Sequence, residues 1–278
     1  MKSSKLTSFI FRYILLVILL VLFIFPVYWM VVSSFQNNTQ LMSFPPKFFG
    51  QNGTLQNYVH ILSQSKFIGY FKNSVIVSFC SVLLSMVVSV FAGYAFSRYE
   101  LPFKNILMAS ILNIQIFPVT VIIISLFTFY TKLHLLNTYR GLILADIIYT
   151  LPFTVWFLKS FFDTIPKSID EAAKIDGCGR LKVLQAVILP LIKPGLIAIA
   201  IYTFLYSWDD FVFALTIMRT ESMKTLPLGI VQSFMGEYVH DYAGMMTLSV
   251  ISSIPVVAAF LFTQKHMIAG LTSGAVKG

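Results

Sequence analysis

Three aspartates lie in stretches that are otherwise almost free of charge, and they are the first side chains here that could do chemistry. Asp146 lies within an apolar stretch at residues 141–158, and Asp209 and Asp210 follow Trp208 near the end of another. A carboxylate at the centre of a membrane helix costs roughly 2.5–3.5 kcal/mol on insertion scales, so it needs a polar partner. Such a group can accept hydrogen bonds from a hydroxyl-rich ligand, or it can bond to a neighbouring helix.

Motifs of several enzyme classes are absent from the sequence. It contains no G-x-x-x-x-G-K-[ST] phosphate loop, and the Gly177-Cys178-Gly179 tripeptide follows no predicted strand. No nucleophile elbow is present. The four histidines lack metal-ligand spacing: His60, His134, His240 and His266. We therefore expect a chain that is no enzyme, binds no cofactor and holds no metal.

One charged loop has the pattern of a short, capped helix. Ser168 stands three residues before Glu171, which is the spacing of a capping box. Ala172 and Ala173 are strong helix formers, and Gly177 stands where a helix end favours a residue that accepts positive φ. The two alanines leave one face flat, so the backbone of a partner could approach closely.

The elements that position these residues are predicted to be membrane helices. Of the 278 residues, 57% are hydrophobic and 11% are charged, whereas a soluble domain carries roughly 25% charged residues. Six charge-poor stretches are each long enough, or nearly so, to cross about 30 Å of hydrocarbon. The sequence therefore predicts an all-α integral membrane protein with six transmembrane helices, at residues 13–35, 72–98, 104–132, 141–158, 193–218 and 242–264.

The distribution of basic residues predicts the orientation of these helices. The net charge of +9 comes from Lys and Arg between apolar stretches, which favours membrane orientation over nucleic-acid binding. One side of the predicted bundle carries thirteen of them: Lys2, Lys5, Arg12, Arg98, Lys104, Lys159, Lys167, Lys174, Arg180, Lys182, Lys193, Lys265 and Lys277. The other side carries seven: Lys47, Lys66, Lys72, Lys132, Arg140, Arg219 and Lys224. The side with thirteen should be cytoplasmic, with both termini on it.

The charged loop resembles the EAA motif of ABC importer permeases. That motif is Glu-Ala-Ala, three residues, Gly, nine residues, Ile, any residue and Leu-Pro. Here it corresponds to Glu171-Ala172-Ala173, Gly177 and Leu189-Pro190, with Val187 in place of the Ile. The alternative is an ordered loop with no partner, but the full spacing in the main predicted cytoplasmic loop favours the motif.

Two further segments resemble the carbohydrate-uptake members of that family. Residues 208–215 are similar to the Trp-Asn-Glu/Asp-Phe-x-Phe-Ala-Leu stretch of carbohydrate permeases, with Asp209 in place of Asn. Residues 270–278 closely match the tail of the maltose-type second permease subunit. The resemblance implies a type I importer permease bundle with a cytoplasmic coupling helix, in a bacterial or archaeal cytoplasmic membrane.

The resemblance also implies partners and a set of coupling residues. The partners would be a different permease subunit, two ATPase subunits that carry the ATP and Mg, and an extracytoplasmic solute-binding protein; no nucleic acid is expected. The ATPase-coupling residues would be Ser168, Asp170, Glu171, Ala172, Ala173, Asp176 and Gly177. The tail residues at the ATPase interface would be Ala275, Val276, Lys277 and Gly278.

A carbohydrate substrate would suit aromatic rings beside carboxylates, because sugars have apolar C–H faces and polar rims. Each of these side chains also has a structural interpretation. Asp146 could bond to a neighbouring helix near the interface, and Trp and Tyr anchor helices at membrane surfaces. The predicted substrate pathway is Trp208, Asp209, Asp210, Tyr206, Asp146, Asn113 and Gln115.

These expectations divide the chain into segments. Residues 1–36 would form a peripheral first helix, 37–71 an extracellular loop, 72–268 a five-helix core with the coupling loop at 159–193, and 269–278 a cytoplasmic tail. Two other function classes stay open at this point. A secondary transporter would need ion-coupling carboxylates and usually an internal repeat, which is not apparent. A membrane-embedded enzyme would need a paired nucleophile and base or metal ligands.

Overall fold

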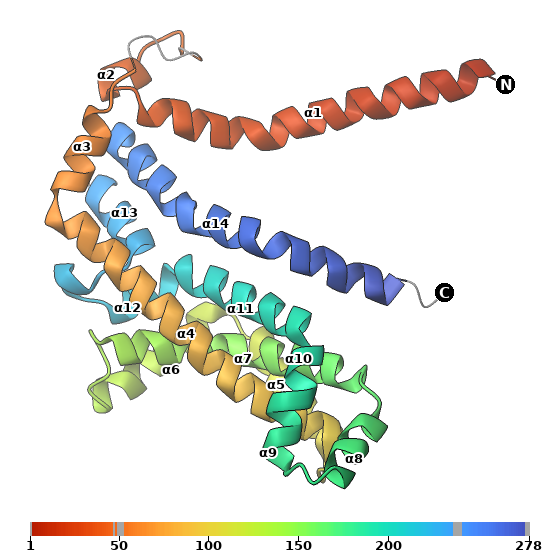
Figure 1. Ribbon diagram of the computed structural model, residues 1–278. Coiled ribbons are helices and arrows are strands. Elements are labelled where there is room, and N and C mark those ends of the chain that lie inside the picture. Colours follow the sequence, from red (N-terminus) through yellow and green to blue (C-terminus); the bar gives the residue numbers. More distant parts are fainter. Residues whose placement is uncertain (1, 47, 49–52, 236–240, 276–278) are drawn as a thin grey trace. The chain divides into compact units, whose positions relative to one another are not determined.

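The computed structural model describes residues 2–46, 48, 53–235 and 241–275, and within these it leaves out the side chains of residues 2–8 and 265–275. The described part is helical, as predicted (Figure 1). The α-helices of five or more residues are α1 Lys2–Ser34, α3 Gln56–Ser63, α4 Ser65–Arg98, α5 Lys104–Asn113, α6 Val119–Lys132, α7 Tyr139–Asp163, α8 Lys167–Ile175, α11 Lys193–Trp208, α12 Val212–Ile217, α13 Leu226–Phe234 and α14 Tyr242–Ala275. The shorter helical segments are α2 Asn38–Leu41, η1 Ile114–Ile116, α9 Arg180–Lys182, the π-helix η2 Val183–Ile188, α10 Leu189–Leu191 and η3 Glu221–Met223.

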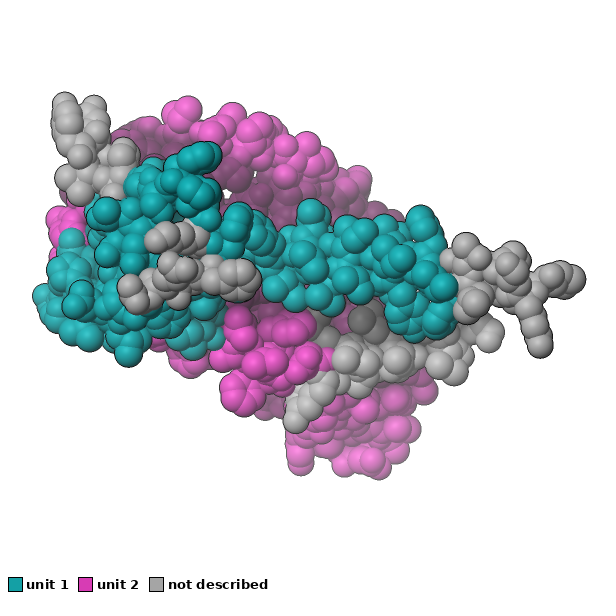
Figure 2. All heavy atoms as spheres, turned by 90° about the horizontal axis from the view of Figure 1, so that it is seen from above, with its two compact units in different colours: residues 1–67, 230–254 teal, residues 68–229, 255–278 magenta. Residues whose placement is uncertain are grey.

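The chain forms two compact units, coloured separately in Figure 2. Unit 1 comprises residues 1–67 and 230–254, and unit 2 comprises residues 68–229 and 255–278. The division falls within α4, α13 and α14, so each of these helices contributes to both units. The functional segments expected from the sequence follow other boundaries, and they stay a prediction.

Unit 1 joins the segment after α1 to the start of α14. Asn38 Nδ2 donates to Asp241 Oδ1 at 2.8 Å, and Thr247 Oγ1 donates to the carbonyl oxygen of Ser34 at 3.2 Å. The rings of Phe67 and Phe234 stack with centroids 5.4 Å apart. The long polar segment after α1 is therefore packed, and it contains α2 and α3.

The helices that could cross a membrane are partly continuous and partly bent. Phe9–Ser34, Ser65–Arg98, Tyr139–Asp163 and Tyr242–Gln264 are long and apolar enough on their own. Two pairs, Lys104–Ile116 with Val119–Lys132 and Arg180–Leu191 with Lys193–Trp208, meet at bends of 99° and 83°. The described residues thus hold four candidate spans, or up to six if each bent pair is one span.

Two predicted spans differ from the structure for physical reasons. The stretch 104–132 is not one straight helix, because Pro118 lacks a backbone N–H and the chain bends there. The fifth span ends at Trp208 and not at residue 218. Asp210 accepts hydrogen bonds from the backbone N–H groups of Phe213 and Ala214, which starts the separate helix α12.

Hydrogen bonds within unit 2 decide whether the bent pairs cross. The backbone N–H of Asn137 donates to the carbonyl oxygen of Ile217 at 2.8 Å, which joins the segments that follow the two pairs. Arg98 donates to the carbonyl oxygens of Phe162 and Ile165 at 3.0 and 3.1 Å, which joins the ends of α4 and α7. If the first pair did not cross, Arg98 and Ile165 would lie on opposite membrane surfaces. If the first pair crossed and the second did not, Asn137 and Ile217 would lie on opposite surfaces. Both contacts are satisfied only when each pair crosses, for six crossings in all.

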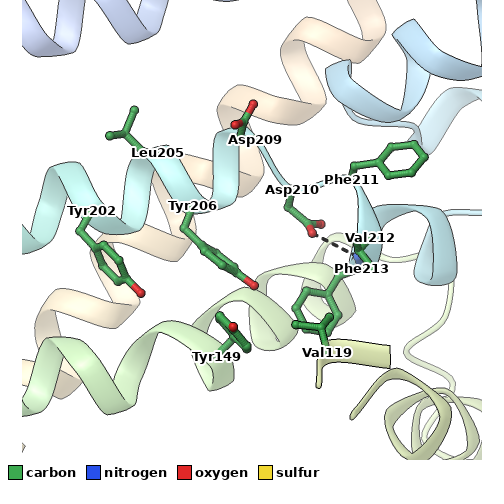
Figure 3. Close-up of a pocket in the computed structure, with 10 residues that line it drawn as sticks. All are labelled: Val119, Tyr149, Tyr202, Leu205, Tyr206, Asp209, Asp210, Phe211, Val212 and Phe213. Carbon is green, nitrogen blue, oxygen red and sulfur yellow. Dashed lines mark hydrogen bonds between the residues drawn. The ribbon is translucent and has the colours of Figure 1, made fainter. Parts of the chain in front are cut away.

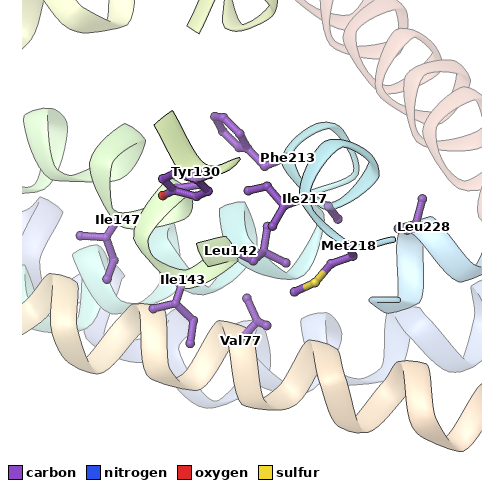
Figure 4. Close-up of a cluster of buried hydrophobic side chains, with 11 residues drawn as sticks. Val77, Tyr130, Leu142, Ile143, Ile147, Phe213, Ile217, Met218 and Leu228 are labelled. Atoms are coloured by element: carbon purple, nitrogen blue, oxygen red, sulfur yellow. The ribbon is translucent and has the colours of Figure 1, made fainter. Parts of the chain in front are cut away.

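A cluster of buried apolar side chains holds the centre of unit 2 together (Figure 4). Val77 of α4 and Tyr130 of α6 meet Leu142 of α7 and Phe213 of α12 there. Burial of an apolar side chain of this size stabilises the fold by roughly 1.5–3 kcal/mol relative to water. In lipid the gain is smaller, and close packing contributes more.

Candidate functional site

The short helix predicted in the charged loop is present as α8. It begins at Lys167 after Pro166, and no side chain caps it. The predicted capping box is therefore wrong, because Ser168 already lies inside the helix and cannot act as its N-cap. At the other end Gly177 has φ +81°, as its position predicted. An added Cβ would meet no neighbour there, so only backbone strain selects glycine.

The two faces of α8 have different surroundings. Asp170 and Ala173 are buried, and Ala173 packs in a cluster with Val183 and Leu184. The opposite face is exposed and includes Ser168, Glu171, Ala172 and Ile175. Ile175 is 86% exposed although it is a large apolar side chain. The outward face of α8 is therefore open, whereas its inner face is covered by the chain.

Asp170 connects the buried face of α8 to the end of α4. Its Oδ2 lies 3.0 Å from Arg98 Nε, and its Oδ1 accepts a hydrogen bond from the Tyr94 hydroxyl at 2.8 Å. The side chains of Arg98 and Asp170 are only 8% and 6% exposed. Removal of one partner from a buried ion pair costs about 3–5 kcal/mol, because the other charge is left uncompensated. Asp170 therefore faces its own chain and not the outward surface.

A small charged cleft of about 170 Å³ lies beside this ion pair. Arg180 lies over the ring of Tyr99 at 5.9 Å from its centroid. The cleft is lined by Tyr94, Arg98, Tyr99, Lys167, Asp170, Glu171, Lys174 and Arg180. Its four basic and two acidic side chains make it a polar surface next to the outward face of α8.

A second pocket of about 540 Å³ lies among α6, α7, α11 and α12, and we call it the aromatic pocket because half of its lining side chains are aromatic (Figure 3). Tyr149 and Tyr206 stack with ring centroids 4.9 Å apart and planes 17° apart. Tyr202 and Tyr206 point from α11 toward α7, whereas the exposed Asp209 points away from these rings. The lining residues are Val119, Tyr149, Tyr202, Leu205, Tyr206, Asp209, Asp210, Phe211, Val212 and Phe213.

The structure separates the predicted pathway residues into several places. Tyr206, Asp209 and Asp210 line the aromatic pocket, but the carboxylate of Asp210 is occupied as the cap of α12. Trp208 is 2% exposed and lies outside this pocket, with its ring stacked on Phe204.

Asp146 has no exposed surface and also lies outside the aromatic pocket. Its Oδ2 accepts hydrogen bonds from Ser81 of α4, at 3.4 Å, and from Ser207 of α11. These bonds connect three helices, as the structural interpretation of Asp146 expects.

The remaining predicted residues are Gln115, Asn113 and the C-terminal tail. Gln115 Nε2 donates to the carbonyl oxygen of Tyr149 at 3.3 Å, next to the aromatic pocket. Asn113 is the last residue of α5 and is exposed. Of the tail, Ala275 is the last residue of α14, and residues 276–278 lie outside the described part of the chain.

Sequence reasoning missed several residues that the structure places at these sites. Arg98 entered only as a basic residue at the end of an apolar stretch, and Tyr94 not at all. Tyr202 had a usable signal, because it lies one helical turn before Tyr206 and so on the same face. Ile175 also had one, because it lies four residues after Glu171 on the predicted helix.

The long apolar helices of the fold define an integral membrane protein of several spans. Within the described residues, no three His, Cys, Asp or Glu side chains gather as a metal site would require. Residues 85–272 match the family described as "Binding-protein-dependent transport system inner membrane component". The chain belongs to this family of ABC importer permeases, which are multi-pass proteins of the inner membrane and are not themselves the ATPase. The alternatives of a secondary transporter and a membrane enzyme are thereby set aside.

Similar proteins support this membership over nearly the whole chain. The trehalose/maltose transport system permease protein MalG of Thermococcus litoralis is 36% identical over 94% of this chain and 94% of its own length. The sulfoquinovosyl glycerol transport system permease protein SmoH of Agrobacterium fabrum is 33% identical over 96% of this chain and 93% of its own. A chain of a bacterial ABC transporter that imports the acidic polysaccharide alginate has the same fold, with a TM-score of 0.84 at 21% identity over 94% of this chain and 97% of that one.

Proposed function

We propose that this chain forms half of the membrane pathway of an ATP-driven importer for a carbohydrate, an oligosaccharide or a related polyol. The observation that carries the substrate class is the set of substrates for which its relatives are named. MalG is named for trehalose and maltose, and SmoH for a sugar-linked glycerol. These substrates share sugar rings with apolar faces and hydroxyl rims.

The aromatic pocket supports the same substrate class on physical grounds. The stacked pair of Tyr149 and Tyr206 offers flat apolar surface together with hydroxyl groups. A sugar ring can place its C–H face on such a ring and direct its hydroxyls to polar groups nearby. Gln115, whose side chain bonds to the carbonyl oxygen of Tyr149, lies next to this pair and can serve as such a polar group.

The outward face of α8 supports coupling to a separate ATPase. Glu171, Ala172 and Ile175 form a small, exposed surface whose opposite side is fixed to the rest of the chain. An ATPase that binds this surface would displace a rigid element. In this proposal closure of two ATPase subunits on ATP turns the pathway outward, and hydrolysis resets it.

The proposal includes the arrangement of the complete importer. A different permease subunit forms the other half of the pathway, and a solute-binding protein delivers the sugar outside the membrane. Both termini and α8 face the cytoplasm, because that side carries thirteen of the twenty Lys and Arg residues. The tail at residues 275–278 extends toward the ATPase interface.

The substrate class is tested by uptake in a strain that lacks this chain. Radiolabelled trehalose, maltose, arabino-oligosaccharides and sulfoquinovosyl glycerol are supplied in turn, with labelled methionine as a control solute. We expect vanadate-sensitive uptake of at least one saccharide to disappear and to return on complementation. Saccharide uptake that is equal with and without the chain across this panel would contradict the proposal.

Tyr206 provides a sharper test of the pocket. Tyr206→Ala removes the stacking surface and should raise the KM for uptake of the identified saccharide about tenfold, or roughly 1.4 kcal/mol. Tyr206→Phe keeps the ring and is the matched control, with a KM within about twofold of the parental value. An unchanged KM in Tyr206→Ala would remove this pocket from the pathway.

A further inference from the structure

A buried polar joint connects α8 to α4, and the sequence motifs do not account for it. We define the joint as Tyr94 and Arg98 of α4, Asp170 of α8, and the carbonyl oxygens of Phe162 and Ile165. We infer that Arg98 and Tyr94 are positioning residues that pass a displacement of α8 on to α4. The inference rests on the proposed docking of an ATPase to α8.

The geometry of Arg98 makes the joint stiff. Its Nε lies 3.0 Å from Asp170 Oδ2, while its two terminal nitrogens donate to Phe162 and Ile165 at 3.0 and 3.1 Å. A guanidinium is planar, so its two hydrogen bonds to these carbonyl oxygens fix the orientation in which it meets Asp170. A movement of α8 must therefore break the ion pair between Arg98 and Asp170 or carry the end of α4 with it.

Tyr94 adds a second attachment one turn earlier on α4. Its hydroxyl donates to Asp170 Oδ1 at 2.8 Å, so both carboxylate oxygens of Asp170 bind α4. Its ring meets Phe162 edge to face, with centroids 5.5 Å apart. Two points of attachment resist rotation as well as translation of α8 relative to α4.

α4 is well placed to carry such a movement across the membrane. It runs without interruption from Ser65 to Arg98, a length of roughly 50 Å at 1.5 Å per residue. At its middle Ser81 bonds to Asp146 of α7, and Ser89 bonds to Thr154 of α7 at 2.6 Å. A shift at the Arg98 end therefore reaches the centre of unit 2.

The joint and the docking surface lie on opposite faces of α8, so they can be altered separately. Asp170 is buried on the inner face, whereas Glu171 and Ile175 are exposed on the outer face. Arg98→Ala therefore leaves the docking surface intact. Arg180→Ala is the matched control, because it removes the same charge from the same cleft without touching the joint.

A native thiol on α4 reports the movement. Cys80 and Cys178 are the two cysteines of the chain, and both are free. With Cys178→Ser, the half-buried Cys80 is the one thiol of this chain that maleimide can label. The experiment measures the rate of Cys80 labelling in the purified complex with its native partner subunits in nanodiscs, with and without ATP plus vanadate.

In the parental chain, which keeps Arg98, we expect ATP plus vanadate to change the rate of Cys80 labelling by about threefold or more. We expect the same change in Arg180→Ala. In Arg98→Ala the ratio of the labelling rates with and without ATP plus vanadate should fall to roughly one. In Arg98→Lys and Tyr94→Phe this ratio should be intermediate. ATP hydrolysis and the amount of bound ATPase should be kept in all four variants. A parental response in Arg98→Ala would overturn the inference, as would a parent whose labelling does not respond.

Failure of the proposed function gives a different result. If no ATPase copurifies with the parental chain, the docking of α8 is contradicted whatever Arg98 does. Tyr94→Phe keeps its ring packing and so guards against a folding defect in Arg98→Ala. If Cys80 labelling in both Tyr94→Phe and Arg98→Lys responds to ATP plus vanadate as strongly as in the parental chain, the joint does not pass on the displacement of α8.

Discussion

Asp146 is a carboxylate with no exposed surface, in the middle of a helix that crosses the membrane. It accepts hydrogen bonds from Ser81 and Ser207, which belong to two other helices. The Ser207 hydroxyl also bonds to Ser81 Oγ at 3.4 Å, so the three side chains form one buried polar cluster to which the carboxylate contributes the charged acceptor. At the scale of the residue, these bonds connect α4, α7 and α11, and we infer a structural role for Asp146 from them.

Substitution of Asp146 tests this structural role. Asp146→Leu leaves the hydroxyls of Ser81 and Ser207 without their acceptor and should destabilise the chain by about 1–3 kcal/mol. Asp146→Asn keeps an acceptor oxygen and should resemble the parent. The apparent Tm of the detergent-solubilised complex measures both, with the exposed Asp209→Asn as a neutral control. A parental Tm in Asp146→Leu would contradict the structural role.

The sequence indicated that these aspartates need partners but not which ones. Ser81 and Ser207 are 65 and 61 residues away from Asp146, so only the packing of three helices brings them together. Asp210 was foreseen as a pathway residue, yet its carboxylate bonds to backbone groups three and four residues later. These bonds had a sequence signal, because Asp close to a helix start favours accepting bonds from the first backbone N–H groups, although the residue directly before α12 is Phe211.

At the scale of the element, α8 shows what a local pattern can and cannot predict. Its length and its C-terminal Gly177 followed from the residues themselves. Its start did not, because Pro166 sets the entry of the helix in place of the Ser168 side chain. The direction of Asp170 could not be predicted at all, since Arg98 reaches it from a helix far away in the sequence.

The outward face of α8 carries its own prediction. Ile175→Asp and Ala172→Trp place a charge or excess bulk on the docking surface, and each should lower the amount of copurified ATPase about tenfold. Ile175→Val and Ala172→Ser are conservative controls that should retain it. Because these side chains are exposed, the chain itself should insert at the parental level. ATPase that stays bound at the parental level in both disruptive variants would place the docking surface elsewhere.

At the scale of the whole molecule, charge-poor stretches located the crossings but not their shape. The bend of 99° at Pro118 and the bend of 83° near Ile192 interrupt two of the six. Continuous hydropathy cannot distinguish a bent span from a re-entrant loop, because both are equally apolar. The contacts Asn137–Ile217 and Arg98–Ile165 make that distinction, since each must lie on one membrane surface.

Six crossings place the loop that contains Ser168 and the loop that contains Ser222 on opposite surfaces. In a background with Cys80→Ser and Cys178→Ser, each exposed serine is replaced in turn, by Ser168→Cys or Ser222→Cys. A membrane-impermeant maleimide should label the Ser222→Cys chain in intact spheroplasts and the Ser168→Cys chain only after permeabilisation. Four crossings with two re-entrant loops would instead expose both positions outside. The reverse pattern would mean that the excess of basic residues does not set the orientation of this chain.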